Sequence, residues 1–128
     1  MLEIGIRGYA EVTVTPELTA LHVGSGSVPV FATPMMVALV EKACSQSIKP
    51  YLEDGFGSVG TIVNIAHTAA SPIGAKVCCE SELVEIDNRR LIFKAVVRDG
   101  AGIVGEGTHE RFIINEERFI AKAAARKG

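Results

Sequence analysis

Two side chains in this sequence, Glu41 and His67, are of types that perform acid–base chemistry and have neighbours that should bury them. Glu41 lies in residues 30–45 (VFATPMMVALVEKACS), where apolar residues recur at helical spacing. His67 shares one face of a strand-like segment with Val63 and Ile65. Burying a carboxylate or an imidazole is costly unless the group is paired or functional. We therefore expect an acid–base pair near neutral pH, although a lone histidine there also fits a core residue bonded to a backbone carbonyl.

Three further residues can border the same site. Thr33 precedes Glu41 by eight residues, so the two side chains lie about 80° apart around a helix axis. Thr33 also precedes a proline, which predicts an N-cap, and the two roles are compatible. Gly60, within GSVGT, either lets a ligand approach the backbone or marks an ordinary bulge. Arg111 shares a strand face with His109 and can contact a phosphate-bearing cofactor or pair with a carboxylate.

The elements that must position these residues are one long helix and several strands. Thr33 and the proline after it start the helix, which we expect to be buried around most of its circumference and to end near Lys49, before a proline. Alternation and turn residues predict strands at residues 4–14, 58–70, 76–86, 91–98 and 102–114, a short extended piece at 18–23, and a last helix at 116–125 capped by Asn115. The glycine- and serine-rich residues 24–29 form either a lid or a plain connector.

The order of these elements predicts an α+β fold in a single domain, residues 1–128. Tight turns at residues 71–74, 87–88 and 99–100 join the last four strands, so we expect a mostly antiparallel meander wrapped around the helix. Such a sheet leaves exposed edges. A dimer that extends the sheet is therefore expected.

Composition excludes several functional classes. The net charge is −2 and no block of lysine and arginine occurs before the C-terminal tail, which argues against a nucleic-acid partner. Apolar runs stop well before the roughly 18 residues of a membrane-spanning helix, and no apolar signal core follows the first residues, so we expect a cytoplasmic protein that does not bind membranes. The three cysteines lack metal-ligand spacing, which predicts no metal site and small, buried or half-buried thiols.

Three stretches of the sequence, VFATPMMVALVEKAC, GSVGTIVNIAHTAA and GTHERFIIN, resemble those of the fluoroacetyl-CoA thioesterase family, within the hotdog-fold thioesterases. The resemblance runs from about Val30 to Phe119 with similar spacing between the stretches, and residues 1–29 match only loosely. It implies a hotdog fold, in which an antiparallel sheet wraps a long central helix. It also implies a homodimer, or a higher oligomer, with acyl-CoA sites near the subunit interface.

The resemblance assigns a role to each candidate residue. It implies that Thr33, Glu41 and His67 are catalytic, that the Gly60 N–H polarises a thioester carbonyl, and that Arg111 lies in the surroundings of the site. The implied reaction is hydrolysis of an acyl-CoA thioester to a free acid and coenzyme A, with no cofactor other than the coenzyme A of the substrate. Glu41 then acts either as nucleophile or as base for water, and His67 as proton donor or orienting partner.

One position departs from the family pattern. The member specific for fluoroacetyl-CoA has a lid phenylalanine upstream of the FAT motif, and ungapped spacing places Ser27 there. We therefore expect another small or medium acyl-CoA as substrate. The alternative is a non-catalytic acyl-CoA-binding hotdog domain. A hotdog hydratase is disfavoured because the Asp and His pair of the hydratase motif is absent.

Overall fold

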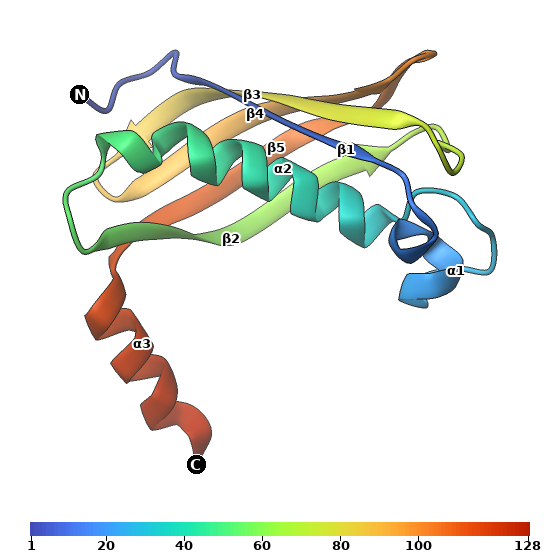
Figure 1. Cartoon of the computed structure of the whole chain (residues 1–128). Coiled ribbons are helices and arrows are strands. Elements are labelled where there is room, and N and C mark those ends of the chain that lie inside the picture. The colour runs from blue at the N-terminus through green and yellow to red at the C-terminus, as the bar shows by residue number, and fades with distance from the viewer.

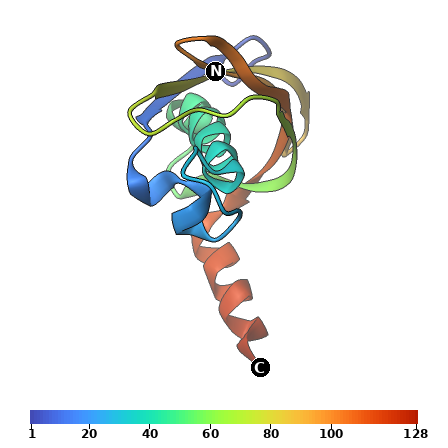
Figure 2. The same ribbon diagram turned by 90° about the vertical axis from the view of Figure 1, so that its right-hand side faces the viewer.

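A curved antiparallel sheet wraps one side of a long helix, and a second helix projects away from this body (Figures 1 and 2). The computed structural model describes residues 1–128. In chain order the elements are β1 (Arg7–Thr13), a 3-10 turn (Pro16–Leu18), α1 (Ala20–Val23), α2 (Thr33–Ile48), a 3-10 turn (Lys49–Tyr51), β2 (Phe56–His67), β3 (Lys76–Asp87), β4 (Arg90–Asp99), β5 (Gly102–Asn115), α3 (Glu116–Ala124) and a last 3-10 turn (Ala125–Lys127). The predicted α+β class and central helix are confirmed.

Helix α2 forms because its apolar residues recur at the helical period. Its buried residues are Met36, Leu39, Val40, Ala43, Cys44 and Ile48. They join the concave face of the sheet in one hydrophobic core of 17 buried residues. Burial around most of the circumference was the wrong expectation for the single chain, since Pro34, Ala38, Lys42 and Gln46 leave one exposed stripe along the helix.

The sheet has the strand order β1-β3-β4-β5-β2, and every pairing is antiparallel. Strands β3, β4 and β5 form the expected meander. The predicted hairpin between residues 58–70 and 76–86 is wrong, because β2 crosses to the far edge and pairs with β5. Strand β2 is thus an edge strand. Its pairing with β5 shifts register between Gly60 and Ile62, so that a bulge forms at Thr61.

Two local predictions at the ends of the chain had different outcomes. Residues 18–23 are not extended, because Thr19 accepts a hydrogen bond from the backbone N–H of His22 and caps the short helix α1. The Asn115 side chain caps α3 as expected, accepting from the Arg118 N–H at 3.0 Å.

None of the helices is long and apolar enough to span a membrane.

The cysteines are free thiols in apolar surroundings. Cys44 and Cys79 are buried, Cys78 is half-buried, and burial raises the pKa of both Cys44 and Cys79 to about 12. These positions confirm the expectation of small, buried or half-buried residues.

Candidate active site

Thr33 and His67 meet where α2 begins and β2 ends. Thr33 Oγ1 lies 2.7 Å from His67 Nδ1, a short hydrogen bond between residues 34 positions apart. The predicted N-cap role of Thr33 is wrong. Ala32 is the cap residue and makes no side-chain bond, while Thr33 is the first residue inside the helix, so its hydroxyl turns across to β2.

The other nitrogen of His67 has no partner. Nε2 is buried and makes no hydrogen bond, and the Phe31 and His67 rings pack in a T-shaped arrangement with centroids 6.5 Å apart. Both residues line an open pocket of about 310 Å³, together with Ala20, Ser25, Val30, Thr33, Thr68, Ala69 and Ala70. A buried polar nitrogen without a partner is rare in a folded protein, which marks this one as a group that can bind a ligand.

Glu41 lies two helical turns further along α2, directly over Gly60 of β2. A side chain at position 60 would collide with the Glu41 carboxylate, so the missing Cβ makes room for it. The Glu41 side chain is 40% exposed, and its Oε2 lies 3.5 Å from Nη1 of Arg111. Of the two contacts that the sequence left open for Arg111, the structure has the one with a carboxylate.

Arg111 itself is held rigidly. Its side chain is only 6% exposed; Nε donates to Ser58 Oγ and Nη2 donates to the Ser58 carbonyl, both at 2.8 Å. Burial lowers the pKa of Arg111, and the neighbouring Glu41 carboxylate opposes that shift. A buried guanidinium with fixed partners is a stable cation, so it can orient the Glu41 carboxylate in one direction.

The single chain does not bring Glu41 and His67 together. Glu41 contacts Arg111 and Gly60, whereas His67 contacts Thr33 and Phe31. Eight residues of helix separate the Thr33 end from the Glu41 end, roughly 12 Å along the axis. The expected acid–base pair is therefore absent within one subunit, and its two halves lie apart along β2, at Gly60 and at His67.

Two members of the Arg111 network, Ser58 and His109, were not identified as site residues from the sequence. His109 is fully buried and stacks on Phe93 with ring centroids 6.3 Å apart. The sequence did contain an indication for His109, because His109 and Arg111 share a strand face. The role of Ser58 depends on the pairing of β2 with β5, which no local pattern reveals.

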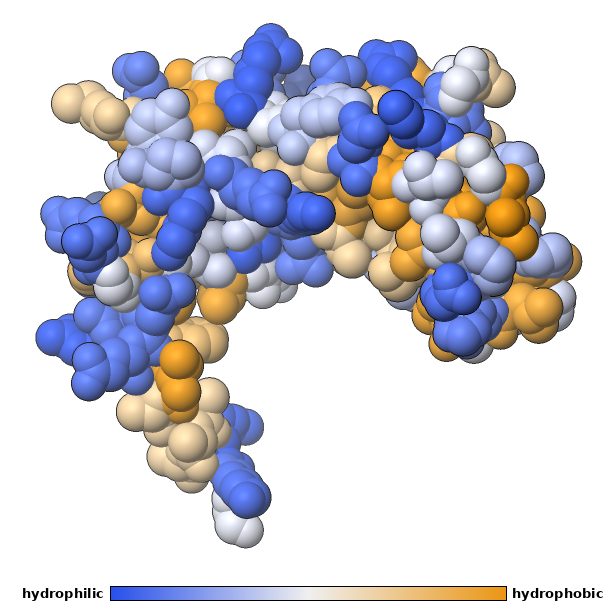
Figure 3. Space-filling view, in the orientation of Figure 1, coloured by the Kyte–Doolittle hydropathy of each residue, from blue (hydrophilic) through white to orange (hydrophobic).

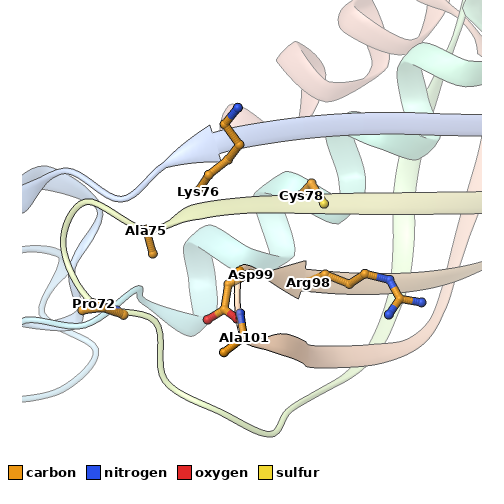
Figure 4. Close-up of a pocket in the computed structure, with 8 residues that line it drawn as sticks. Pro72, Ala75, Lys76, Cys78, Arg98, Asp99 and Ala101 are labelled. Carbon is orange, nitrogen blue, oxygen red and sulfur yellow. The ribbon is translucent and has the colours of Figure 1, made fainter.

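A larger pocket of about 480 Å³ contains none of the predicted site residues (Figure 4). Residues of β3, β4 and the adjoining turns line it: Pro72, Ala75, Lys76, Cys78, Arg98, Asp99, Gly100 and Ala101. Its two cations are paired, Lys76 with Glu11 at 3.3 Å and Arg98 with Glu80 at 3.5 Å. Size alone therefore does not identify the site of the chemistry.

Comparison with known proteins assigns the family. Residues 14–117 match the family model of the fluoroacetyl-CoA-specific thioesterase FlK. The fluoroacetyl-CoA thioesterase of Streptantibioticus cattleyicolor is 40% identical over 127 residues, which cover 94% of this chain and 91% of that protein.

Solved structures agree with this assignment. A structure of the fluoroacetyl-CoA thioesterase FlK, at 37% identity, superimposes with a TM-score of 0.93 and covers 100% of this chain and 99% of its own. Mutants of that enzyme have been solved with fluoroacetate and CoA and with acetyl-CoA. A hot-dog-like protein from Thermanaerovibrio acidaminovorans, at 18% identity, shares the fold with a TM-score of 0.88 over 98% of this chain and 93% of its own. The chain therefore belongs to the fluoroacetyl-CoA-specific thioesterase family and is a thioester hydrolase with the hotdog fold.

Proposed function

We propose that this protein hydrolyses a small or medium acyl-CoA thioester to the free acid and coenzyme A, at a site made by Thr33, Glu41 and His67. The observation that carries the proposal is the His67 imidazole, which lines the pocket, is bonded through Nδ1 to Thr33 and has no hydrogen-bond partner at Nε2. An imidazole held in this way can pass a proton to or from a reacting group. Family membership supplies the class of the reaction.

The site is complete only in a homodimer. Residues 60–64 of the edge strand β2 are all exposed, and Ile62 and Val63 among them are apolar. If two copies of β2 pair antiparallel about Val63 and Asn64, Gly60 of one subunit lies opposite the partner's His67. Glu41 of one subunit then shares a site with Thr33 and His67 of the other, which removes the separation of roughly 12 Å within one chain.

The exposed apolar surface supports the same arrangement. Hydrophobic residues cover part of the projecting helix α3 and part of the region of α1 (Figure 3). The large ones are Leu21, Val23, Val28, Phe119 and Ile120, each at least 40% exposed. Strand β2 begins near α3 and ends near α1 (Figure 1). Surface of this kind beside an unpaired strand edge is typical of an interface between subunits.

In this composite site the chemistry needs one carboxylate, one imidazole and donors to the carbonyl oxygen. Glu41, oriented by Arg111, acts in one of two ways. It attacks the thioester carbonyl and forms a mixed anhydride that water then hydrolyses to the free acid and the Glu41 carboxylate, or it removes a proton from a water that attacks the carbonyl directly. The Gly60 N–H stabilises the negative charge that develops on the carbonyl oxygen. As the C–S bond breaks, His67 gives the leaving thiolate its proton, and Thr33 fixes the orientation of the ring.

We expect the enzyme not to be specific for fluoroacetyl-CoA and to act on another small or medium acyl-CoA. The loop before α2 carries Ser27 where the family member specific for fluoroacetyl-CoA has its lid phenylalanine, and residues 24–29 contain no aromatic side chain. We therefore expect no strong selection for a fluorinated acyl group.

A panel of acyl-CoA esters tests the function. Thiol release from acetyl, fluoroacetyl, branched, aromatic and longer acyl-CoA is measured for the wild type, Glu41→Gln and His67→Ala. We expect at least one ester to be hydrolysed, with a loss of roughly 10²–10⁴-fold in each variant. Equal rates in all three proteins would disprove the assigned roles, and binding of CoA esters without hydrolysis would favour a non-catalytic binding domain.

Mixed dimers test whether the site is shared. Glu41→Gln and His67→Ala chains carrying different tags are coexpressed, and the mixed dimer is isolated by both tags. One of its two sites then has both residues intact, so we expect about half of the wild-type activity from two inactive parents. If each subunit instead holds a complete site, the mixed dimer stays inactive.

A further inference from the structure

His109 is a fully buried titratable residue that the proposed chemistry does not use. It lies on β5, two positions before Arg111 and on the same face of the strand, and its ring stacks on Phe93 with an interplanar angle of 28°. A buried imidazole is costly unless both ring nitrogens find partners. The partners of His109 therefore reveal what holds it there.

Those partners permit only one tautomer. Nδ1 lies 2.8 Å from the Ile62 carbonyl oxygen, which can only accept, and Nε2 lies 3.1 Å from Nη1 of Arg111, which can only donate. The hydrogen must therefore be on Nδ1 and the lone pair on Nε2, and the ring is neutral. An imidazolium would point an N–H at the guanidinium.

The charges around His109 agree with a neutral ring. Burial lowers the pKa of His109, and the Arg111 charge lowers it further. The Ile62 carbonyl and the carboxylates of Glu41 and Glu110 act in the opposite direction, and the net shift is downward.

Each hydrogen bond of His109 fixes a different part of the site. The bond to the Ile62 carbonyl fixes β2 directly after the bulge. Thr61 is the extra residue of this bulge, and Gly60 comes directly before it. The bond from Arg111 holds Nη1, the only guanidinium nitrogen that Ser58 does not bind. One side chain thus ties the backbone that carries Gly60 to the cation that faces Glu41.

The distances around Nη1 suggest why a neutral acceptor serves this position. Nη1 lies 3.1 Å from His109 and 3.5 Å from Glu41, so the histidine bond is the shorter and the carboxylate is held loosely. A neutral acceptor fixes the guanidinium without cancelling its charge. Glu41 therefore keeps the attraction of Arg111, which orients its carboxylate.

We propose that His109 is a positioning residue: its neutral ring, protonated at Nδ1, aims Arg111 at Glu41 and locks the bulge that presents Gly60. The proposal rests on the function proposed above, because it gives Glu41 and Gly60 their roles in the reaction. His109 acts through these groups and does not touch the reacting atoms.

Variants at position 109 test the role. His109→Leu removes the acceptor and the donor together, whereas His109→Gln keeps one of each. We expect kcat to fall by about tenfold or more in His109→Leu with little change in KM, and to recover in part in His109→Gln. Val77→Ala, a change in a fully buried residue of β3, serves as the control for lost stability and should keep the wild-type kcat once folded. Wild-type kcat in folded His109→Leu, or an equal loss in Val77→Ala, would overturn the proposal.

Nitrogen NMR of the imidazole rings gives a readout that does not depend on activity. In the labelled wild-type protein at about pH 7.5 we expect the His109 ring to show a protonated Nδ1 and an unprotonated Nε2. A ring protonated at Nε2 would overturn the proposal even if the enzyme is active. If no acyl-CoA is hydrolysed, the proposed function fails, and the NMR result still decides the state of His109.

Discussion

Replacing Gly60 by alanine should separate catalysis from folding. The added Cβ would overlap the Glu41 carboxylate and would lie 3.0 Å from His109 Cε1 and 3.4 Å from Arg111 Nη1. The Glu41 carboxylate ends a flexible, 40% exposed side chain and can move away, while the buried ring of His109 must shift by only a few tenths of an ångström. Alanine also lowers the conformational entropy of the unfolded chain, which stabilises the folded protein by about 0.4–1 kcal/mol and offsets part of this cost. We therefore expect a change of less than about 1.5 kcal/mol in the free energy of unfolding.

The effect on the reaction should be far larger. The methyl group displaces Glu41 from Arg111 and stands beside the N–H that, in the proposed mechanism, faces the carbonyl oxygen. Alanine keeps this N–H, so the loss comes from the misplaced carboxylate and from the blocked approach of the thioester, and we expect kcat to fall by roughly 10²-fold. Steady-state kinetics on the preferred acyl-CoA, with urea unfolding of the same samples, measures both quantities. Gly100→Ala is the matched control, because its Cβ meets nothing within 4 Å. A folded Gly60→Ala protein with the wild-type kcat would refute the argument, and so would an activity loss explained by unfolding.

Two further predictions concern groups outside the site. At about pH 8 an alkylating reagent should label the half-buried Cys78 first, because burial raises the pKa of Cys44 and Cys79 to about 12; mass spectrometry of the native protein showing rapid labelling of Cys44 would contradict this. The Ser71 hydroxyl lies 2.8 Å from the Asp99 carboxylate and lowers the pKa of that carboxyl. Because the ionised form is favoured in the folded protein, the bond stabilises the fold above the ordinary aspartate pKa of about 4. This contribution is lost as the pH falls through the lowered pKa of Asp99. Ser71→Ala should therefore cost more unfolding free energy at pH 7 than at pH 2, and an equal cost in urea titrations at both values would be inconsistent with the pairing.

Local sequence patterns predicted the elements of this fold but not all of their partners. Helical spacing located α2, and alternation located all five strands, because both signals come from residues close in the chain. The hairpin wrongly predicted after β2 shows the limit, since a turn signal does not say which strand becomes the neighbour. The resemblance to a known family, which rests on the motifs, supplied the hotdog fold and the acyl-CoA substrate class, but the strand order was not predicted.

The site shows the same limit. Spacing alone singled out Glu41 and His67, yet the partner of Glu41 is Arg111, 70 residues away, and the partner of His67 is Thr33. Thr33 was expected to cap its own helix because capping is the local option. A tertiary hydrogen bond to His67 replaced it, and no pattern within the helix distinguishes the two outcomes.

The bulge at Thr61 determines which residues of β2 face the helix. Before it, Ser58 and Gly60 face the helix side, and after it His67 does, so the inward positions change from even to odd numbers. Deleting Thr61 would leave a regular strand with His67 still on the helix side, but it would remove the bulge between Gly60 and the Ile62 carbonyl that His109 binds. An inserted residue would turn either Gly60 or His67 to the outer face. Insertions and deletions of one residue between Ser58 and His67 should therefore be absent among active relatives, while changes of length at the turn after β3, around Asn88, should be tolerated. In an alignment of this family, a constant length of β2 would therefore be evidence for this geometry of the site.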